Sequence, residues 1–139
     1  MTHVVAKSPS RPRGFTLVEL AIVVLVIGIL AAVAAPKMVN TASTARSNGT
    51  KQSLAVIRDA LEMYKAQNGN YPTAATLTTA LQPMLSGPFP TAQVGTNQNA
   101  SIAPSTQSPI ATVEAGAFGW VYNQTTGEFR VNDAGSITW

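Results

Sequence analysis

One residue in this chain stands where its chemistry needs a partner. Glu19 is the single charged residue in the run Phe15–Ala35, which is otherwise almost entirely Val, Ile, Leu and Ala. A carboxylate in an apolar environment is costly unless a positive charge or hydrogen-bond donors compensate it. A helix N-terminus supplies part of that compensation through its dipole, so the position of Glu19 near the start of the run favours the carboxylate.

Few other residues are of a type that catalyses reactions or binds metals. The chain has no Cys, which excludes disulfides, zinc–thiolate sites and a thiol nucleophile. Its one histidine, His3, lies in the first few residues, which argues against catalysis by His and against a cluster of His ligands. We find no nucleophile–base pair, phosphate-binding loop or paired carboxylates, so we expect a protein that is not an enzyme.

The net charge of +3 comes entirely from the first residues of the chain. Residues 1–14 carry Lys7, Arg11 and Arg13 and no acid, which leaves six basic and six acidic residues in 15–139. Charged residues make up 11% of the chain, against about 25% in typical soluble domains. The chain therefore has a basic leader and no basic binding face, and we expect no nucleic-acid partner.

The apolar run is long enough to cross a membrane. Its 21 residues would span roughly 31 Å as a helix, close to the thickness of the hydrocarbon core. Three basic residues precede it and only Lys37 follows closely, which predicts a cytoplasmic N-terminus and places residues 37–139 outside. A secretory signal peptide, with small residues at Ala32-Val33-Ala34, and a plain membrane anchor are alternatives, but both leave Glu19 unexplained.

The run Arg13–Leu20 (Arg-Gly-Phe-Thr-Leu-Val-Glu-Leu) resembles the processing site of type IV pilins and type II secretion pseudopilins. The resemblance implies that prepilin peptidase cuts after Gly14 and methylates the new N-terminus at Phe15. It includes Glu19, the long apolar helix and Pro36 at the usual helix position. The leader of 14 residues is basic, as the short leaders of this family are.

Glu19 has two possible roles after cleavage, and the sequence does not distinguish them. Residues i and i+4 share a helix face, so the carboxylate lies one turn from a Phe15 amine released by cleavage. It can pair with that amine within one chain, or with the amine of a neighbouring subunit, and the resemblance implies the second role, in which Glu19 and Phe15 set the register of a filament. Pro36 lacks an amide donor and predicts a kink or local loosening, and in the family this region can melt on assembly.

The rest of the chain predicts a small α+β domain. Residues 37–68 read as an amphipathic helix, because Leu54, Ile57, Leu61 and Tyr64 form one apolar stripe that we expect to dock onto a sheet. Asn68-Gly69 ends this helix. The following segments are predicted in order as a short helix within 74–85, an exposed loop at 91–109, a strand at 110–114, a hairpin at 117–132 and a last strand at 136–139.

The predicted fold is therefore pilin-like: a long N-terminal helix, transmembrane in its first half, packed on a small antiparallel β-sheet. The predicted organisation is a basic prepilin leader at 1–14, a transmembrane and assembly helix at 15–36, and a periplasmic domain at 37–139 with its sheet within 110–139. The aromatic residues of the hairpin, which alternate along its strands, are expected to be core.

A calcium site needs separate consideration, since major pseudopilins often hold Ca²⁺ in a C-terminal loop. Ca²⁺ takes six to eight oxygen ligands, usually with several carboxylates. The candidates here, Glu114, Glu128 and Asp133, are scattered over turns and strands and show no residue-by-residue match to the family's calcium loop. We therefore expect no metal and no other cofactor, and name no ligands.

The sequence predicts a type II secretion pseudopilin, cleaved and N-methylated by prepilin peptidase and assembled into a helical filament. Its expected partners are identical or related subunits, the peptidase, an inner-membrane assembly platform and the membrane itself. It would be a single-pass protein of the cytoplasmic membrane with its C-terminal domain outside. The alternatives are a type IV pilus subunit, for adhesion, motility or DNA uptake, and a membrane-anchored binding domain that does not polymerise.

Overall fold

The computed structural model describes residues 14–139, and residues 1–13 of the predicted leader 1–14 lie outside the described residues. The contacts divide the chain into two compact units, one ending at Asn40 and the other comprising Thr41–Trp139. The elements are, in chain order, α1 (Leu17–Asn68), α2 (Leu77–Leu81), the 3₁₀ helix η1 (Gln82–Met84), β1 (Ile102–Pro104), β2 (Trp120–Asn123) and β3 (Glu128–Val131).

Helix α1 has 52 residues and is assigned as helix throughout, including Pro36 and the polar stretch 40–50. At its C-terminal end Gly69 has φ +80°, and its amide donates to the carbonyl of Lys65 at 2.8 Å. A glycine in this left-handed conformation is a common way to satisfy the last carbonyls of a helix. The predicted stop at Asn68-Gly69 is confirmed.

The sheet has the order β1-β2-β3. Strands β2 and β3 pair antiparallel, from Trp120 opposite Val131 to Asn123 opposite Glu128, so the predicted hairpin within 117–132 is confirmed. Its turn includes Gly127 at φ +78°.

Strand β1 pairs parallel to β2, so the sheet is mixed and the predicted all-antiparallel sheet is wrong. β1 lies at 102–104, inside the segment predicted as a loop at 91–109 and before the predicted sheet region at 110–139. Parallel neighbours require a long connection, here residues 105–119, in place of a hairpin turn. A three-residue strand is too short to show an alternating pattern, and so this edge of the sheet gave no signal.

The predicted strand at 110–114 does not form. Backbone N–H groups of this segment donate to side-chain oxygens of Glu128, Gln107 and Asn132, at 2.8 to 3.2 Å. These donors are therefore not free to pair with a neighbouring strand.

The predicted last strand at 136–139 is replaced by turns. Ser136 donates its backbone N–H to the carbonyl of Asp133 at 2.9 Å, and Trp139 donates to Ser136 at 3.1 Å. The carbonyl oxygens of Ile137 and Trp139 accept hydrogen bonds from arginine side chains. Polar side chains, and not a sheet partner, satisfy this backbone.

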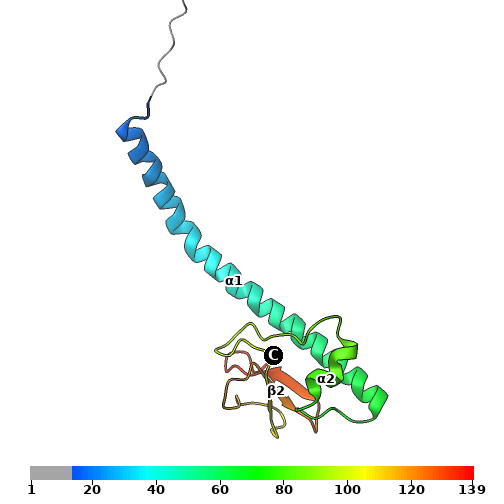
Figure 1. Cartoon of the computed structure of the whole chain (residues 1–139). Helices are drawn as coiled ribbons and strands as arrows, with labels where there is room; N and C mark the ends of the chain where they lie inside the picture. Colours follow the sequence, from blue (N-terminus) through cyan, green and yellow to red (C-terminus); the bar gives the residue numbers. More distant parts are fainter. Residues whose placement is uncertain (1–13) are drawn as a thin grey trace, which may run out of the picture. The chain divides into compact units, whose positions relative to one another are not determined.

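The core of the second unit lies between the C-terminal half of α1 and the sheet (Figure 1). Leu54, Ile57 and Leu61 of α1 are buried against β2 and β3, and Tyr64 is partly buried beside them, which confirms the predicted docking stripe. The residues that complete this cluster are Ala60, Leu77, Leu81, Ala92, Trp120, Tyr122, Phe129 and Val131.

Both faces of β2 are covered. Trp120 and Tyr122 belong to the cluster under α1, while Val121 packs in a second cluster with Ala103, Ile110 and Ile137. All four residues of β2 are consequently buried. The hairpin aromatics Trp120, Tyr122 and Phe129 are fully buried core residues, as expected, whereas Phe118 is only partly buried, against the second cluster.

Candidate processing and assembly site

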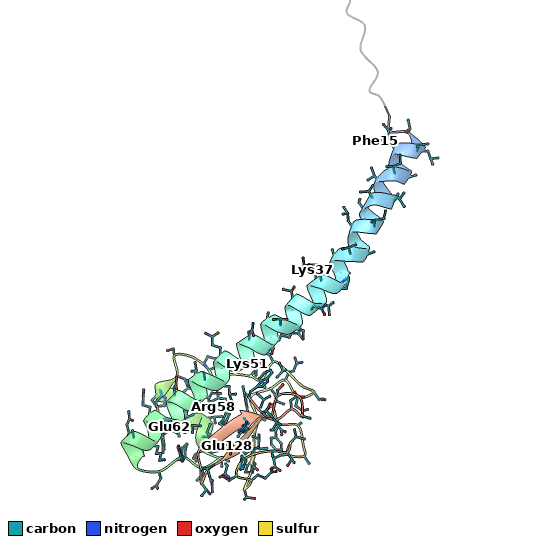
Figure 2. The ribbon with its side chains drawn as sticks, turned by 180° about the vertical axis from the view of Figure 1, so that it is seen from behind. Phe15, Lys37, Lys51, Arg58, Glu62 and Glu128 are labelled. Carbon is teal, nitrogen blue, oxygen red and sulfur yellow. The ribbon has the colours of Figure 1, made fainter. Side chains whose placement is uncertain are left out.

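The predicted cleavage point lies outside helix α1. Gly14, Phe15 and Thr16 have no regular secondary structure, and α1 begins at Leu17. The side chain of Phe15 is 83% exposed, and Figure 2 shows Phe15 at the N-terminal end of α1. The Gly14–Phe15 peptide bond is therefore in non-helical, exposed backbone, the form in which peptidases accept their substrates.

Glu19 and Thr16 together form a reciprocal cap at the start of α1. The Thr16 backbone N–H and hydroxyl both donate to Glu19 Oε2 at 2.8 Å, and the Glu19 N–H donates to Thr16 Oγ1 at 3.2 Å. Thr16 stands at the N-cap and Glu19 at the third helical position, which is the arrangement called a capping box. Two backbone donors that a helix start leaves unsatisfied are thereby satisfied.

Sequence reasoning missed the part played by Thr16. The signal was available, because Thr-x-x-Glu ahead of an apolar run is a recognised helix-start pattern. Its consequence concerns Glu19: the carboxylate already accepts two hydrogen bonds from its own chain. The nitrogen of Phe15 is an amide here, since Gly14 precedes it, and the predicted pair between Glu19 and a released Phe15 amine stays a prediction.

The first part of α1 exposes its apolar side chains. The large hydrophobic residues from Leu17 to Val39 are 47 to 85% exposed. Among the described helices, α1 is long and apolar enough to cross a membrane. Pro36 lies inside this helix without interrupting it, and its predicted loosening on assembly stays a prediction.

A polar hollow of about 530 Å³ lies on the second unit between α1, the β2–β3 turn and the C-terminal residues. Arg58 and Arg130 line it with Glu62 and Glu128; Arg130 Nε and Glu128 Oε1 form an ion pair of 2.6 Å. Figure 2 labels Arg58 and Glu62 on α1 and Glu128 beside them.

The charged groups of this hollow are already engaged. Both arginines donate to main-chain carbonyl oxygens, and Glu62 accepts a hydrogen bond from the Tyr71 hydroxyl at 2.6 Å. Burial and the nearby Arg130 lower the pKa of Arg58 from its usual value. The arrangement holds structural elements together and presents no nucleophile with an adjacent base.

The residues that could hold the calcium ion implied by the resemblance do not fit one. In the described part of the chain, no group of three or more His, Cys, Asp or Glu residues lies together. Glu128 is bound to Arg130, an oxygen of Asp133 accepts the Ser136 hydroxyl at 2.8 Å, and an oxygen of Glu114 accepts Gln107 Nε2 at 3.2 Å. Glu114 and Asp133 line a second hollow of about 230 Å³ with Asn132, and Glu128 is not part of it. Two carboxylates that already have partners fall short of the six to eight oxygens that a calcium ion takes.

Two family models match this chain in adjoining segments. Residues 9–35 match the prokaryotic N-terminal methylation motif, and residues 37–103 match the type II secretion system protein G model. The first covers Gly14, Phe15 and Glu19, and the second ends before β2. No solved structure matches this chain.

Curated relatives point to the same family. The chain is 35% identical over 78 residues to type II secretion system core protein G of Klebsiella pneumoniae, covering 56% of this chain and 54% of the relative. It is 40% identical over 60 residues to the protein of that name from Pseudomonas aeruginosa, covering 43% of this chain and 42% of the relative.

A pilus protein is among the relatives as well. The type IV narrow pilus major component PilA5 of Thermus thermophilus is 40% identical over 63 residues, which cover 45% of this chain and 54% of that protein. The chain thus spans about half the length of the curated relatives that it matches. The methylation motif, the protein G match and the long apolar helix together make this chain similar to the type IV pilins and type II secretion pseudopilins.

Proposed function

We propose that this protein is a filament-forming pseudopilin of a type II secretion system. The observation that carries the proposal is the exposed apolar part of α1, which directly follows a Gly14–Phe15 processing motif and carries Glu19 in its first turn. The protein G match over residues 37–103 supports secretion as the process served. An exposed apolar helix of this length requires lipid or other helices around it.

Processing would occur at the exposed bond between Gly14 and Phe15. A prepilin peptidase cuts after Gly14 and methylates the amine of Phe15. In the described residues a Cβ added at Gly14 meets nothing within 4 Å, so the chain itself places no steric demand for glycine there. The requirement for a small residue is then a property of the peptidase.

Assembly would use the new amine as the partner of a carboxylate. Glu19 of one subunit pairs with the Phe15 amine of its neighbour and sets the axial register of the filament. Until then, Thr16 supplies two hydrogen bonds to the Glu19 carboxylate, so the acidic group can reside in an apolar helix before a neighbour arrives. This cap explains how the precursor tolerates Glu19 ahead of cleavage.

The protein would sit in the cytoplasmic membrane through α1, with its N-terminus in the cytoplasm. The basic residues Lys7, Arg11 and Arg13 ahead of the helix support this orientation. Its partners would be identical or related subunits, the prepilin peptidase and an inner-membrane assembly platform. The role would be structural, and the arginines that line the polar hollow support this because they are bound to Glu128 and to main-chain carbonyls.

A type IV pilus subunit is the second candidate, and one observation favours it. The match to the pilus component PilA5 covers 45% of the chain at 40% identity, the same identity as the match to the Pseudomonas aeruginosa secretion protein. A membrane-anchored domain that does not polymerise is the third.

Deleting the gene separates these candidates. Loss of secreted enzymes from the culture medium, with surface pili unchanged in electron micrographs, supports the secretion role. Loss of pili with normal secretion supports the pilus role, and neither loss supports the anchored domain. N-terminal sequencing of the mature protein adds a separate test: an N-methylated Phe15 supports the pilin pathway, while a start at Ala35 indicates an ordinary signal peptide.

A further inference from the structure

The loop 114–118, which precedes β2, is bound by the side chain of Asn132. Asn132, which follows β3 and is 8% exposed, accepts the backbone N–H of Glu114 at 2.8 Å through Oδ1. Its Nδ2 donates to the carbonyl oxygens of Glu114 at 3.0 Å and Phe118 at 3.2 Å. Two main-chain carbonyls four residues apart therefore converge on one nitrogen.

Two further asparagines complete this arrangement. Asn97 donates to the carbonyl of Gly116 at 3.0 Å, and Asn99 donates to the carbonyl of Ala117 at 3.0 Å. Four carbonyl oxygens of the loop 114–118 are thus bound by side-chain amides of Asn97, Asn99 and Asn132, a set that we call the asparagine clasp. The loop has no strand partner, so these side chains supply the donors that a neighbouring strand would otherwise give.

Convergent carbonyl oxygens are also what a bound Ca²⁺ collects when it fastens a loop. Calcium contacts its oxygens at about 2.3–2.6 Å and takes six to eight of them, with carboxylates to balance its charge. Here the neutral side-chain amide of Asn132 donates hydrogen bonds to the carbonyls in place of a cation. It also accepts an N–H through Oδ1, which a cation cannot do.

The nearby carboxylates already have hydrogen-bond partners, which agrees with a loop held by neutral amides and not by a cation. Of the nearby carboxylates, Glu114 is engaged by Gln107, and Asp133 by the hydroxyl of Ser136. Asp133 also lies against the backbone of Gly95, where an added Cβ would meet its side chain at 2.8 Å. Neither group is free to move toward a cation without giving up its present partner.

We propose that the asparagine clasp does in this chain what a bound calcium ion does when it holds a loop, so that the second unit folds without Ca²⁺. The loop 114–118 and Asn132 lie beyond residue 103, where the protein G match ends, whereas Asn97 and Asn99 lie inside it. The hydrogen bonds alone carry the inference. It is also independent of filament assembly, because it concerns the fold of residues 41–139 alone.

The test is thermal unfolding of the full chain in detergent micelles, followed by tryptophan fluorescence, to which the buried Trp120 and the partly buried Trp139 both contribute. The first comparison needs no substitution: the wild-type protein is measured in excess EGTA and then with millimolar free Ca²⁺. We expect the two midpoints to agree within about 1 °C. A midpoint that rises by several degrees with Ca²⁺ overturns the proposal.

The second comparison uses Asn132→Asp, which keeps the shape of the side chain but replaces the donor with a carboxylate oxygen that faces two carbonyls. We expect its midpoint in EGTA to fall by about 5 °C or more, since two partly buried carbonyls lose their donor and face a carboxylate. Added Ca²⁺ should recover part of that loss, because the new carboxylate and the two carbonyls are oxygen ligands. Hydrogen exchange at residues 114–118 should show the same loss and recovery.

Gln124→Glu is the matched control, because it adds the same charge on an exposed residue of the hairpin turn. Its midpoint should not respond to Ca²⁺. An Asn132→Asp variant as stable as wild type in EGTA would show that the amide does not hold the loop. A loss of stability that Ca²⁺ leaves unchanged would show that the amide and a cation are not equivalent there. Either result overturns the proposal.

Discussion

The guanidinium of Arg58, on α1, donates two hydrogen bonds to the carbonyl oxygen of Phe129, on β3, from Nε at 3.1 Å and from Nη2 at 2.9 Å. The same Nη2 donates to the carbonyl of Trp139 at 2.6 Å. One half-buried cation therefore joins the helix to the hairpin and to the C-terminal residues. Arginine suits this position, because it keeps its charge even where burial lowers its pKa.

Replacing Arg58 with Met should destabilise the second unit strongly. The change keeps the apolar stem but removes the side-chain donor of the Phe129 carbonyl and leaves the Trp139 oxygen only the 3.4 Å bond from Arg130 Nη1, at a cost of about 2–3 kcal/mol. Urea unfolding of the full chain in micelles measures this loss. Arg46→Met, an exposed position on the same helix, is the control and should change stability little. Equal stability of the two variants would contradict the role assigned to Arg58.

Replacing Gly127 with Ala should disturb the β2–β3 turn. The residue has φ +78°, and a Cβ there would overlap the ring of Tyr71. The combined strain is expected to cost about 1–3 kcal/mol. The midpoint of thermal unfolding reports it, with Gly87→Ala as the control, since a Cβ at Gly87 meets nothing within 4 Å. Adding Tyr71→Ala should recover the steric part of the loss, and no recovery would argue against the overlap.

Replacing Thr16 with Val should weaken assembly, while Thr16→Ser should preserve it. Valine keeps the shape but removes the hydroxyl that donates to Glu19 and accepts its N–H. Loss of such a cap should reduce assembled filament by roughly twofold to tenfold. Immunoblots of filaments sheared from cells measure the effect, normalised to the cleaved protein in the membrane. Full assembly of the valine variant would show that the capping box is dispensable.

Replacing Glu19 with Ala should leave cleavage largely intact and impair assembly. The peptidase acts at the bond after Gly14, whereas the carboxylate is needed as the partner of a neighbour's Phe15 amine. The mature and precursor bands on an immunoblot report cleavage, and filament yield reports assembly. Asp59→Ala removes an exposed acid of the second unit and is the control. Wild-type filaments from the Glu19 variant would rule out its role in register.

The stability of the second unit should fall as the pH rises above about 10, the usual pKa of tyrosine. Burial raises the pKa of Tyr122, whose hydroxyl donates to the carbonyl of Pro72 at 2.9 Å, and the hydrogen bond to Glu62 raises the pKa of Tyr71. The folded state therefore favours neutral tyrosine. The unfolded chain loses these protons first, so their contribution is complete below pH 10 and declines as pH rises toward the folded pKa values.

Urea midpoints measured between pH 8 and 11 check this dependence. The double variant Tyr71→Phe, Tyr122→Phe should be less stable at pH 8 but should show a shallower decline. The two proteins differ only in these two hydroxyl groups, so the difference between the slopes reports on them. Parallel slopes would contradict the assignment.

The parts of this protein that the sequence predicts well depend on residues close together in the chain. The Gly14–Phe15 motif with Glu19, the apolar run, the stripe on α1 and the β2–β3 hairpin each show a complete pattern within a short window. The capping box is equally local, and Thr16 could have been recognised from the Thr-x-x-Glu pattern alone.

Tertiary structure decided the features whose hydrogen-bond partners lie far away in sequence. Strand β1 exists because β2 offers it an edge, and residues 110–114 are not a strand because Glu128, Gln107 and Asn132 take their N–H groups. The turns at 136–139 are likewise fixed by Arg58 and Arg130. A short segment has only a weak preference for one backbone conformation. Its conformation is therefore set by hydrogen-bond donors and acceptors that are far away in sequence but close in space, and these become neighbours only once the chain has folded.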